Sequence, residues 1–295
     1  MAPQNILITG SSAGFGAALV HQFLSAGHNV IATSRNPART PDLVSSITSH
    51  PSGRGRWLTL DVTSPQETIS ATIREAESHF GPLDVVINNA GYSVLGAVEA
   101  MDEEKARVQF DTNFWGPLRV IKAVVPGMRE RRRGTVVNVS SIAGLQGIPS
   151  TGIYAASKHA LEALSESLSL ELAPFNVRVL LIQPGGFRTN FLNPTTSLQT
   201  LPFPPAYTST PLHTALDRFA AYEGHQLGDP EEGAKRIYEA VMQEGMWKEV
   251  GADGKGWLRL MIGSDAWERG TKALEGKLEN IRGLRRVAAS TDIKK

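Results

Sequence analysis

Short apolar segments alternate along the chain with longer segments of helical periodicity, and this alternation constrains the fold more than any other feature. Six apolar segments begin near residues 5, 28, 55, 83, 135 and 176, and helical segments of ten or more residues separate them. Strands joined through helices pair in parallel, and the helices then cover both faces of the sheet. We therefore expect an α/β fold of three layers with one doubly wound parallel sheet. A shorter segment, LRLMI, brings the sheet to about seven strands.

The length of the chain suits one large domain or two small ones. With 295 residues, 41% of them hydrophobic, it can bury a sizeable core, and no internal repeat or linker divides it. We assign residues 1–295 to a single domain, with 193–228 as an inserted substrate loop and a frayed tail after about 284. The part from 193 to 211 is rich in Pro, Thr and Ser and has no period. It is predicted to be a mobile lid that lacks stable secondary structure, with a passive surface connection as the alternative.

The composition argues against several classes of protein. A formal net charge of +1 offers no basic field for nucleic acid or for a membrane surface. The chain has no cysteine, which rules out disulfides, thiolate zinc sites and cysteine nucleophiles, and we expect no metal. The first residues show no leader pattern and no apolar run reaches membrane-spanning length, so a cytoplasmic protein is predicted.

A glycine-rich turn joins the first apolar segment to the first helical one. Gly10, Gly14 and Gly16 have the spacing G-x-x-x-G-x-G, and Ser12 and Phe15 lie in the same turn. Glycines let the backbone turn tightly and bring a helix N-terminus against a pyrophosphate. We assign all five residues to a cofactor site. A glycine turn without a ligand is the alternative, but the strand before it and the helix after it are those that dinucleotide binding requires.

The second apolar segment ends at Ser34 and Arg35, where the 2′ position of an adenine ribose would be read. A carboxylate here would accept hydrogen bonds from a free 2′-hydroxyl, but this segment has none. A guanidinium instead favours a 2′-phosphate, so the sequence predicts NADP(H) as the cofactor. The alternative is that Arg35 merely lies in solvent at a strand end.

The third and fourth apolar segments end in polar or small residues. Asp61 and Val62 close the third, and Asn88, Ala90 and Gly91 close the fourth. The carboxyl ends of parallel strands line the ligand crevice of an open sheet, and small residues there leave room for a flat cofactor. We assign these residues to the cofactor site, with an ordinary strand-to-turn stop as the alternative for the fourth segment.

Tyr154 and Lys158 are four residues apart in a helical segment, so their side chains share one face. A fixed ammonium favours the phenolate of a neighbouring tyrosine, which makes Tyr154 a candidate proton donor and acceptor. Ser141 follows the fifth apolar segment, where a strand end brings its hydroxyl toward the same pocket. Asn113 lies among apolar residues of an earlier helix, and a buried amide needs partners. On these residues alone, a surface Tyr–Lys pair and an Asn bonded to a neighbouring helix are the simpler interpretations.

Taken together, these motifs resemble the short-chain dehydrogenase/reductase family over residues 5 to about 283. The resemblance implies a Rossmann fold and a ketoreductase-type activity, reversible hydride transfer between NADP(H) and a ketone or secondary alcohol. The matching motifs, in the family's order and spacing, are TGSSAGFG at residues 9–16, NNAG at 88–91, Asn113, Ser141, Tyr154, Lys158, and PGGFRT at 184–189.

The resemblance also implies a role for each site residue. Tyr154 would protonate the carbonyl oxygen, Ser141 would steady that oxygen, and Lys158 would bind the nicotinamide ribose and lower the pKa of the tyrosine. Asn113 would kink its helix and hold a water in a proton relay. The implied cofactor contacts are Asp61 to the adenine, Asn88 to the adenosine side, Arg35 to the 2′-phosphate, Thr189 to the carboxamide, and Pro184, Gly185 and Phe187 in the last loop.

Within the family, the chain looks like the branch near NADP-dependent 17β-hydroxysteroid dehydrogenases and related carbonyl reductases. It departs from the commonest glycine turn at Phe15, whose side chain is expected to pack beneath the cofactor. A homodimer or homotetramer that acts on a small carbonyl or alcohol is implied. Two alternatives stay open, an isomerase or dehydratase on the same scaffold and a non-catalytic NADP(H)-binding redox sensor. Such sensors typically lose the Tyr or the Lys, and this chain keeps both.

Overall fold

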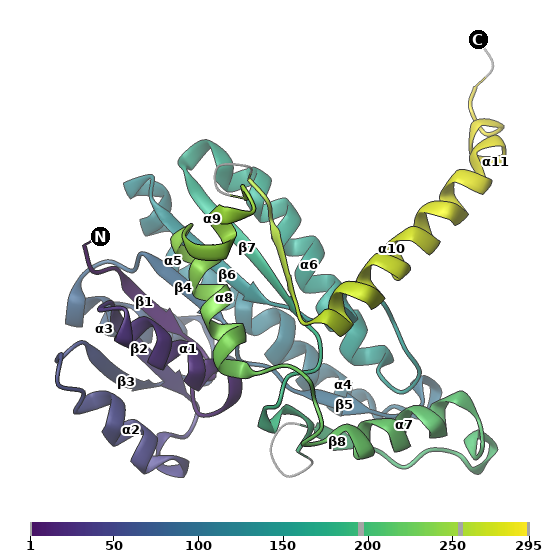
Figure 1. The fold of residues 1–295 in the computed structure, drawn as a ribbon, viewed down its shortest axis with the longest axis horizontal. Coiled ribbons are helices and arrows are strands. Elements are labelled where there is room, and N and C mark those ends of the chain that lie inside the picture. Colours follow the sequence, from purple (N-terminus) through teal and green to yellow (C-terminus); the bar gives the residue numbers. More distant parts are fainter. Residues whose placement is uncertain (1, 194–197, 253–255, 294–295) are drawn as a thin grey trace.

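A parallel sheet of seven strands runs through the centre of the protein (Figure 1). The computed structural model describes residues 2–193, 198–252 and 256–293. The strand order is β3-β2-β1-β4-β6-β7-β9, and every pairing is parallel. The predicted doubly wound sheet is therefore confirmed. The strands are β1 (Asn5–Ile8), β2 (Asn29–Ser34), β3 (Gly55–Thr59), β4 (Val85–Asn88), β6 (Gly134–Val139), β7 (Val177–Pro184) and β9 (Arg259–Ile262).

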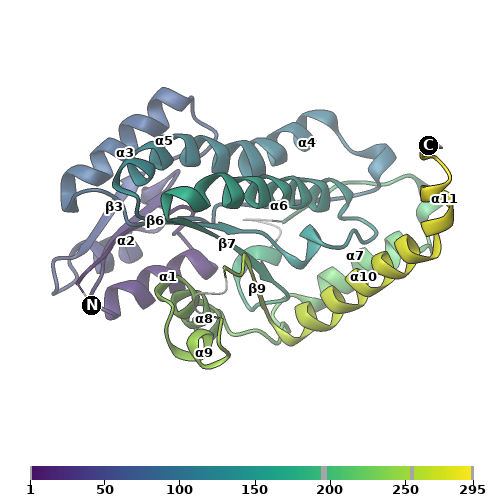
Figure 2. The ribbon, with the colours of Figure 1, turned by 90° about the horizontal axis from the view of Figure 1, so that it is seen from above.

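Helices cover both faces of this sheet, which gives the expected three layers (Figure 2). In β1, Ile6 and Ile8 pack into one core while Leu7 packs into the other, as the two-residue period of a strand requires. The core of Ile6 and Ile8 includes residues of α1 (Gly14–Ser25), α2 (Pro41–Thr48), α8 (Pro230–Met242) and α9 (Gly245–Glu249). The core of Leu7 includes residues of α3 (Gln66–Phe80), α5 (Gly116–Arg131) and α6 (Gly152–Leu172).

The substrate-loop segment is more regular than the sequence predicts. β8 (Leu198–Thr200) pairs in parallel with β5 (Ser93–Leu95), and α7 (Pro211–Tyr222) follows. The prediction that 193–211 lacks secondary structure is therefore wrong for β8, because three backbone pairings with β5 stabilise it. Residues 194–197, also part of the predicted lid, lie outside the described residues.

The remaining helices lie outside the two cores. α4 (Glu103–Phe110) precedes α5, and α10 (Ser264–Gly283) and α11 (Arg285–Ala289) end the described chain. Asp229 caps α8 by accepting a hydrogen bond from the Glu231 backbone N–H (2.9 Å). Gly263 occupies the N-cap of α10, and Ser264 is its first helical residue. Among the described helices, none is long and apolar enough to cross a membrane.

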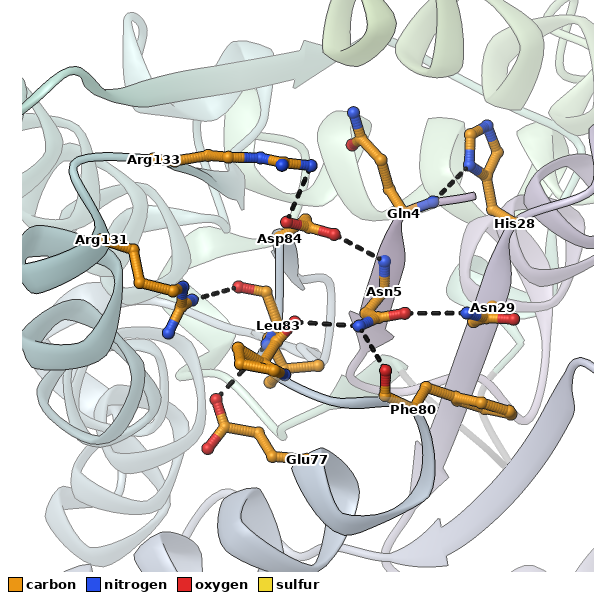
Figure 3. Close-up of polar contacts among 11 residues, drawn as sticks. Gln4, Asn5, His28, Asn29, Glu77, Phe80, Leu83, Asp84, Arg131 and Arg133 are labelled. Atoms are coloured by element: carbon orange, nitrogen blue, oxygen red, sulfur yellow. Dashed lines mark hydrogen bonds and ion pairs between the residues drawn. The ribbon is translucent and has the colours of Figure 1, made fainter. Parts of the chain in front are cut away.

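The amino ends of the strands carry a dense polar network (Figure 3). The side-chain amide of Asn5 donates to the Phe80 carbonyl (2.8 Å) and accepts from Asn29 Nδ2 (2.8 Å). Asp84 accepts from the Asn5 backbone N–H (3.0 Å) and pairs with Arg133 (3.1 Å). These contacts tie together the starts of β1, β2, β4 and β6, at the end of the sheet opposite the glycine turn.

Candidate active site

The turn between β1 and α1 is held against the end of β4. Gly10 and Gly14 have left-handed backbones with φ of +67° and +54°, and a Cβ on Gly16 would lie 2.2 Å from the Gly10 carbonyl oxygen. Only glycine meets these requirements without strain. Asn89 donates to the carbonyls of Thr9 (2.9 Å) and Gly10 (3.0 Å), a bracing role that the sequence analysis did not predict. The protein's own bonds therefore fix the shape of this turn.

The first turn of α1 presents backbone N–H groups at the carboxyl edge of the sheet. Ala13 is the N-cap and has no side chain that could cap these groups, and none of residues 14–17 is acidic. N–H groups at a helix start lack intrahelical partners, and together with the helix dipole they favour an anion. Ser12 is half-buried in the same turn. These groups fit the pyrophosphate of a dinucleotide.

Arg35 follows β2 and Tyr92 follows β4, and the charge of Arg35 acts on the Tyr92 phenol. Arg35 is exposed, while its neighbour Ser34 is buried at the end of β2. Burial raises the pKa of Tyr92, and the guanidinium of Arg35 opposes that rise. At the end of β3, Asp61 accepts hydrogen bonds from the backbone N–H (2.9 Å) and the hydroxyl (2.7 Å) of Thr63, which fix the carboxylate. The polar residues predicted for the adenosine half therefore lie at the carboxyl ends of three strands of the sheet, β2, β3 and β4.

Asn88 is buried at the end of β4 with one atom unused. Its Nδ2 donates to Asn138 Oδ1 on β6 (2.8 Å), and Asn138 Nδ2 donates to Ser165 Oγ on α6 (2.8 Å). Among the described residues, Asn88 Oδ1 has no hydrogen-bond partner. A buried acceptor left unpaired is costly, and a hydroxyl of a bound ligand would satisfy it. Together with the glycine turn, this atom shows that the residues fit a dinucleotide.

The smaller residues predicted for the cofactor site pack closely around the turn. A Cβ on Gly10 would lie 2.8 Å from the Cα of Ala90. Val62 is buried against Gly116 at the start of α5. Gly91 lies between two polar residues of the candidate catalytic group, because a Cβ there would be 3.1 Å from Asn113 Oδ1 and 3.6 Å from Lys158 Nζ.

Asn113 lies in a π-helical turn, Asp111–Trp115, that interrupts the helix between α4 and α5. It is fully buried, and its Nδ2 donates to the Tyr92 carbonyl (2.9 Å) and to Ser157 Oγ (3.2 Å). Its Oδ1 accepts from the Tyr92 backbone N–H (3.1 Å). Ser157 Oγ in turn donates to the Tyr154 carbonyl (2.7 Å). Single π turns are frequent at functional sites, and this one links the end of β4 to the helix of Tyr154.

Tyr154, Ser141 and Lys158 come together at the start of α6. Tyr154 is buried and shares a side-chain hydrogen bond with Ser141. Lys158 Nζ lies 5.8 Å from the centre of the tyrosine ring and donates to the Val139 carbonyl (2.9 Å). The structure thus brings together the phenol, hydroxyl and ammonium that the sequence predicts, with Asn113 beside them.

The electrostatics of this group differ from the prediction. Burial raises the pKa of Tyr154 to about 12, although the hydrogen bond with Ser141 lowers it in part. Burial also lowers the pKa of Lys158 to about 8, against the opposing effect of the Glu162 carboxylate. The prediction that Lys158 holds Tyr154 near its phenolate is therefore wrong for this structure. Desolvation is the dominant effect, and the ammonium bonds to the Val139 carbonyl instead.

Glu162 is a buried carboxylate one helical turn beyond Lys158, and the sequence analysis did not single it out. It accepts hydrogen bonds from Ser140 Oγ (2.8 Å) and from Gln183 Nε2 (2.8 and 2.9 Å). Arg259 Nε lies 3.5 Å from it. Glu162 therefore connects α6 to the ends of β6 and β7 and to β9, directly behind the candidate catalytic group.

The loop after β7 is held by Asp265, from the first turn of α10. Asp265 Oδ2 accepts from the Gly186 backbone N–H (2.8 Å), and a Cβ on Gly185 would lie 2.1 Å from Asp265 Oδ1. Pro184 is the last residue of β7. This loop reaches the glycine turn, because a Cβ added to Gly14 would lie 3.1 Å from the Cβ of Thr189.

Phe15 and Phe187 pack against each other, with ring centroids 4.7 Å apart. Both rings also contact Gly233 of α8, where a Cβ would lie 2.5 Å from Phe15 Cε1 and 2.9 Å from Phe187 Cε1. The two side chains therefore join the glycine turn to the last loop and belong to the core on the α8 side, which gives them a packing role. The expected position of Phe15 beneath a cofactor rests on the family resemblance alone.

A cavity of about 390 Å³ lies between the loop before α6 and the start of α7. Ser150 lines it four residues before Tyr154, with a left-handed backbone (φ +71°) and, among the described residues, no partner for its buried Oγ. A larger cavity of about 480 Å³ lies between α8, α9 and β9, and Tyr154 lines neither of the two. The residues lining the smaller cavity are all uncharged: Val98, Ile148, Pro149, Ser150, Ala206, Tyr207, Thr210, Pro211 and Leu212.

Comparison with known proteins decides the family. The family model described as short chain dehydrogenase matches residues 4–199. The chain belongs to the short-chain dehydrogenase family. The 3-ketodihydrosphingosine reductase of Bacteroides thetaiotaomicron is 44% identical over 191 residues, which cover 65% of this chain and 66% of that protein. This short-chain dehydrogenase is accordingly an oxidoreductase of alcohol or carbonyl groups, in a family that binds a nicotinamide cofactor.

Solved structures agree with this assignment. A short-chain dehydrogenase from Streptomyces avermitilis is 34% identical, with a TM-score of 0.85 and coverage of 99% of both chains. The structure of ElxO with NADP bound is 25% identical, with a TM-score of 0.69, and the match covers 90% of this chain and 99% of that one. The fold of this short-chain dehydrogenase, including the part after residue 199, therefore recurs in experimental structures.

Proposed function

We propose that the protein is an NADP(H)-dependent oxidoreductase that transfers hydride reversibly between the nicotinamide and a ketone or secondary alcohol, with Tyr154 as general acid and base. The observation that carries this proposal is the convergence of Tyr154, Ser141, Lys158 and Asn113 at the sheet edge that also holds the glycine turn. A non-catalytic sensor has no need of a buried phenol bonded to a serine beside an ammonium.

The residues of the chain handle the proton and the orientation of the substrate. When bound, the nicotinamide supplies or accepts the hydride. In reduction, Tyr154 gives its phenolic proton to the carbonyl oxygen while Ser141 steadies that oxygen. A pKa raised to about 12 keeps Tyr154 protonated, which is the form that a general acid needs. Alcohol oxidation needs the phenolate, so its rate is expected to increase as the pH rises.

Arg35 supports NADP(H) over NAD(H). Its guanidinium is exposed beside the glycine turn, and no carboxylate follows β2 to repel a 2′-phosphate. The NADP bound to ElxO agrees with this preference. The lack of cysteine fits a reducing compartment, and we place the enzyme in the cytoplasm.

The uncharged cavity beside Ser150 supports an apolar substrate. Its walls come from the loop before α6 and from the segment 193–228, in which Tyr207, Pro211 and Leu212 lie. A ketone substrate also agrees with the printed name of the Bacteroides reductase. The test is a panel of apolar ketones and their alcohols with NADPH or NADH. Product formation with stoichiometric loss of NADPH absorbance is expected, whereas product without such loss would indicate an isomerase or dehydratase.

The segment 193–211 is proposed to close over the substrate. Lids of this kind gate access and determine substrate choice, so substitutions at Tyr207 should change substrate preference while NADPH affinity stays nearly constant. Limited proteolysis with and without NADPH and substrate is the direct test. We expect cleavage within the segment to slow when both are bound, and equal cleavage in the two states would mean that it is a passive connection.

A further inference from the structure

The last long helix, α10, leaves the body of the molecule and ends in α11 far from the sheet (Figures 1 and 2). Among the described residues, the contacts that anchor it to the body extend to Lys277. Ala266 and Gly270 are buried, and Lys277 Nζ donates to the Leu145 carbonyl (2.5 Å). From residue 274 onward, every described residue is exposed. An isolated helix of this length is marginal in water, so the outer half of α10 needs a partner.

A narrow apolar seam follows the exposed side of α10. Trp267, Thr271, Leu274, Leu278 and Ile281 succeed one another in steps of four and three residues. Four of them are large and exposed, with exposed fractions of 64% for Trp267, 47% for Leu274, 44% for Leu278 and 68% for Ile281. Alternating steps of four and three produce the seam of a coiled coil, which is narrower than the face with which a helix covers a sheet. The seam therefore fits another helix.

The charges on α10 indicate what kind of helix its partner is. A helix that lies on an anionic membrane or on nucleic acid is predominantly basic, whereas residues 264–283 carry equal numbers of acidic and basic side chains. A helix of balanced charge is complementary to itself. The acidic residues are Asp265, Glu268, Glu275 and Glu279, and the basic residues are Arg269, Lys272, Lys277 and Arg282.

We propose that α10 pairs with α10 of a second copy of this chain, antiparallel, about a two-fold axis. Glu268, Glu275 and Arg282 lie seven residues apart on one edge of the seam. An axis beside Glu275 sets Glu268 of each copy opposite Arg282 of the other. A parallel pair would instead set Lys277 of one copy opposite Arg282 of the other, and like charges there are unfavourable.

The first test is the mass of the full-length protein by sedimentation velocity. Wild type is expected to be a dimer, and Leu278→Glu combined with Ile281→Glu is expected to be a monomer at the same concentration. Both residues are exposed, so the body of the protein should stay folded, and circular dichroism should show at most the loss of helicity in the outer half of α10 that has lost its partner. The control is Leu170→Glu, an exposed residue (78%) of α6, which should leave the dimer intact.

Three outcomes would overturn the proposal: a monomeric wild type, a double variant of unchanged mass, or a control variant that dissociates equally. Sedimentation of wild type with phosphatidylserine vesicles, lost in the double variant, would make α10 a membrane-surface helix instead.

The second test uses the lack of cysteine in the natural chain, because one introduced thiol then reports one contact. Glu275→Cys places a thiol at the two-fold axis, beside the same thiol of the second chain. Copper–phenanthroline oxidation is then expected to link most chains as dimers. Lys272→Cys, away from the seam, should link few. Equal yields at the two positions, or no link at position 275, would contradict the antiparallel pairing.

Glu275→Gln removes a like-charge contact at the axis and should tighten the dimer about twofold, in line with the small energy of exposed pairs.

Discussion

The buried polar groups at the amino ends of the strands (the amino edge) and those at the carboxyl ends (the carboxyl edge) differ in whether their hydrogen-bonding capacity is used. At the amino edge, the side-chain amide of Asn5 has partners for both its N–H group and its oxygen, and Asp84 bonds to a backbone N–H and to a guanidinium (Figure 3). At the carboxyl edge, Asn88 Oδ1 and Gln183 Oε1 are buried and, within the described chain, have no hydrogen-bond partner. Lys158 is buried there with a lowered pKa. Groups that must bind a ligand keep bonding capacity free, whereas groups that only hold strands together use all of theirs.

Tyr154→Phe is the substitution expected to have the largest effect, and it acts on the carboxyl edge alone. It removes the proton that the substrate oxygen needs, so kcat should fall at least about 100-fold. Thermal unfolding and NADPH binding should change little, because the ring still packs against Phe191 (centroids 5.9 Å apart). Steady-state kinetics and NADPH titration measure both. Turnover near that of wild type would refute the assigned role of Tyr154.

Arg35→Asp is expected to invert the cofactor preference. A charge-assisted bond to the 2′-phosphate contributes about 1.5–3 kcal/mol, so kcat/KM for NADPH should fall about 10- to 100-fold while that for NADH rises. Arg39→Asp, on the short helical turn that follows β2, is a matched change of charge and should leave the ratio nearly constant. A wild type that favours NADH would contradict the interpretation of Arg35.

Asp84→Ala tests the amino edge. The variant loses the bond to the Asn5 backbone N–H and the ion pair with Arg133, and the free energy of unfolding should fall by about 2 kcal/mol. Turnover at a temperature where the protein stays folded should equal that of wild type, because the catalytic group lies at the other edge. Chemical denaturation and kinetics on one preparation provide both values. A large loss of kcat would mean that the two edges are not independent.

Lys158→Met is expected to abolish most turnover and yet to stabilise the cofactor-free protein. A Lys pKa of about 8, below its ordinary 10.5, means that the buried ammonium destabilises the folded state at lower pH, and that wild-type stability gains from this group as the pH rises from about 8 to 10.5. The variant should exceed wild type by about 2 kcal/mol at pH 7, after the loss of the bond to the Val139 carbonyl, and the excess should shrink toward pH 10. A difference that is independent of pH would contradict the lowered pKa.

The sequence predicts the sheet well because each strand repeats one pattern over several residues. It also predicts which side chains meet at the carboxyl edge, since Ser141, Tyr154, Lys158 and Asn113 do converge. The pairing of β5 with β8 could not be predicted, because strands of three residues show no period and their partners are far apart in the chain.

The site residues that were not predicted differ in whether the sequence indicates them. Glu162 could have been predicted, because it continues the face of Tyr154 and Lys158 by one more turn of the same helix. Asn89 lies within a motif that the sequence analysis used, but its bonds go to backbone atoms of another segment, which a sequence does not reveal. The pKa of Tyr154 depends on how completely it is buried, and burial of one phenol is a tertiary property.

The π-helical turn at Asp111–Trp115 has a consequence for how this enzyme tolerates insertions and deletions. A turn of this kind holds one residue more than an α-helical turn. Deleting Thr112 would restore a continuous helix, and everything before it would rotate by about 100° relative to α5. Either Asn113 would then leave the Tyr92 backbone or α4 would leave α6. A single-codon deletion here should therefore be far more harmful than one in the exposed loop around Gly53, even though neither removes a residue that touches substrate.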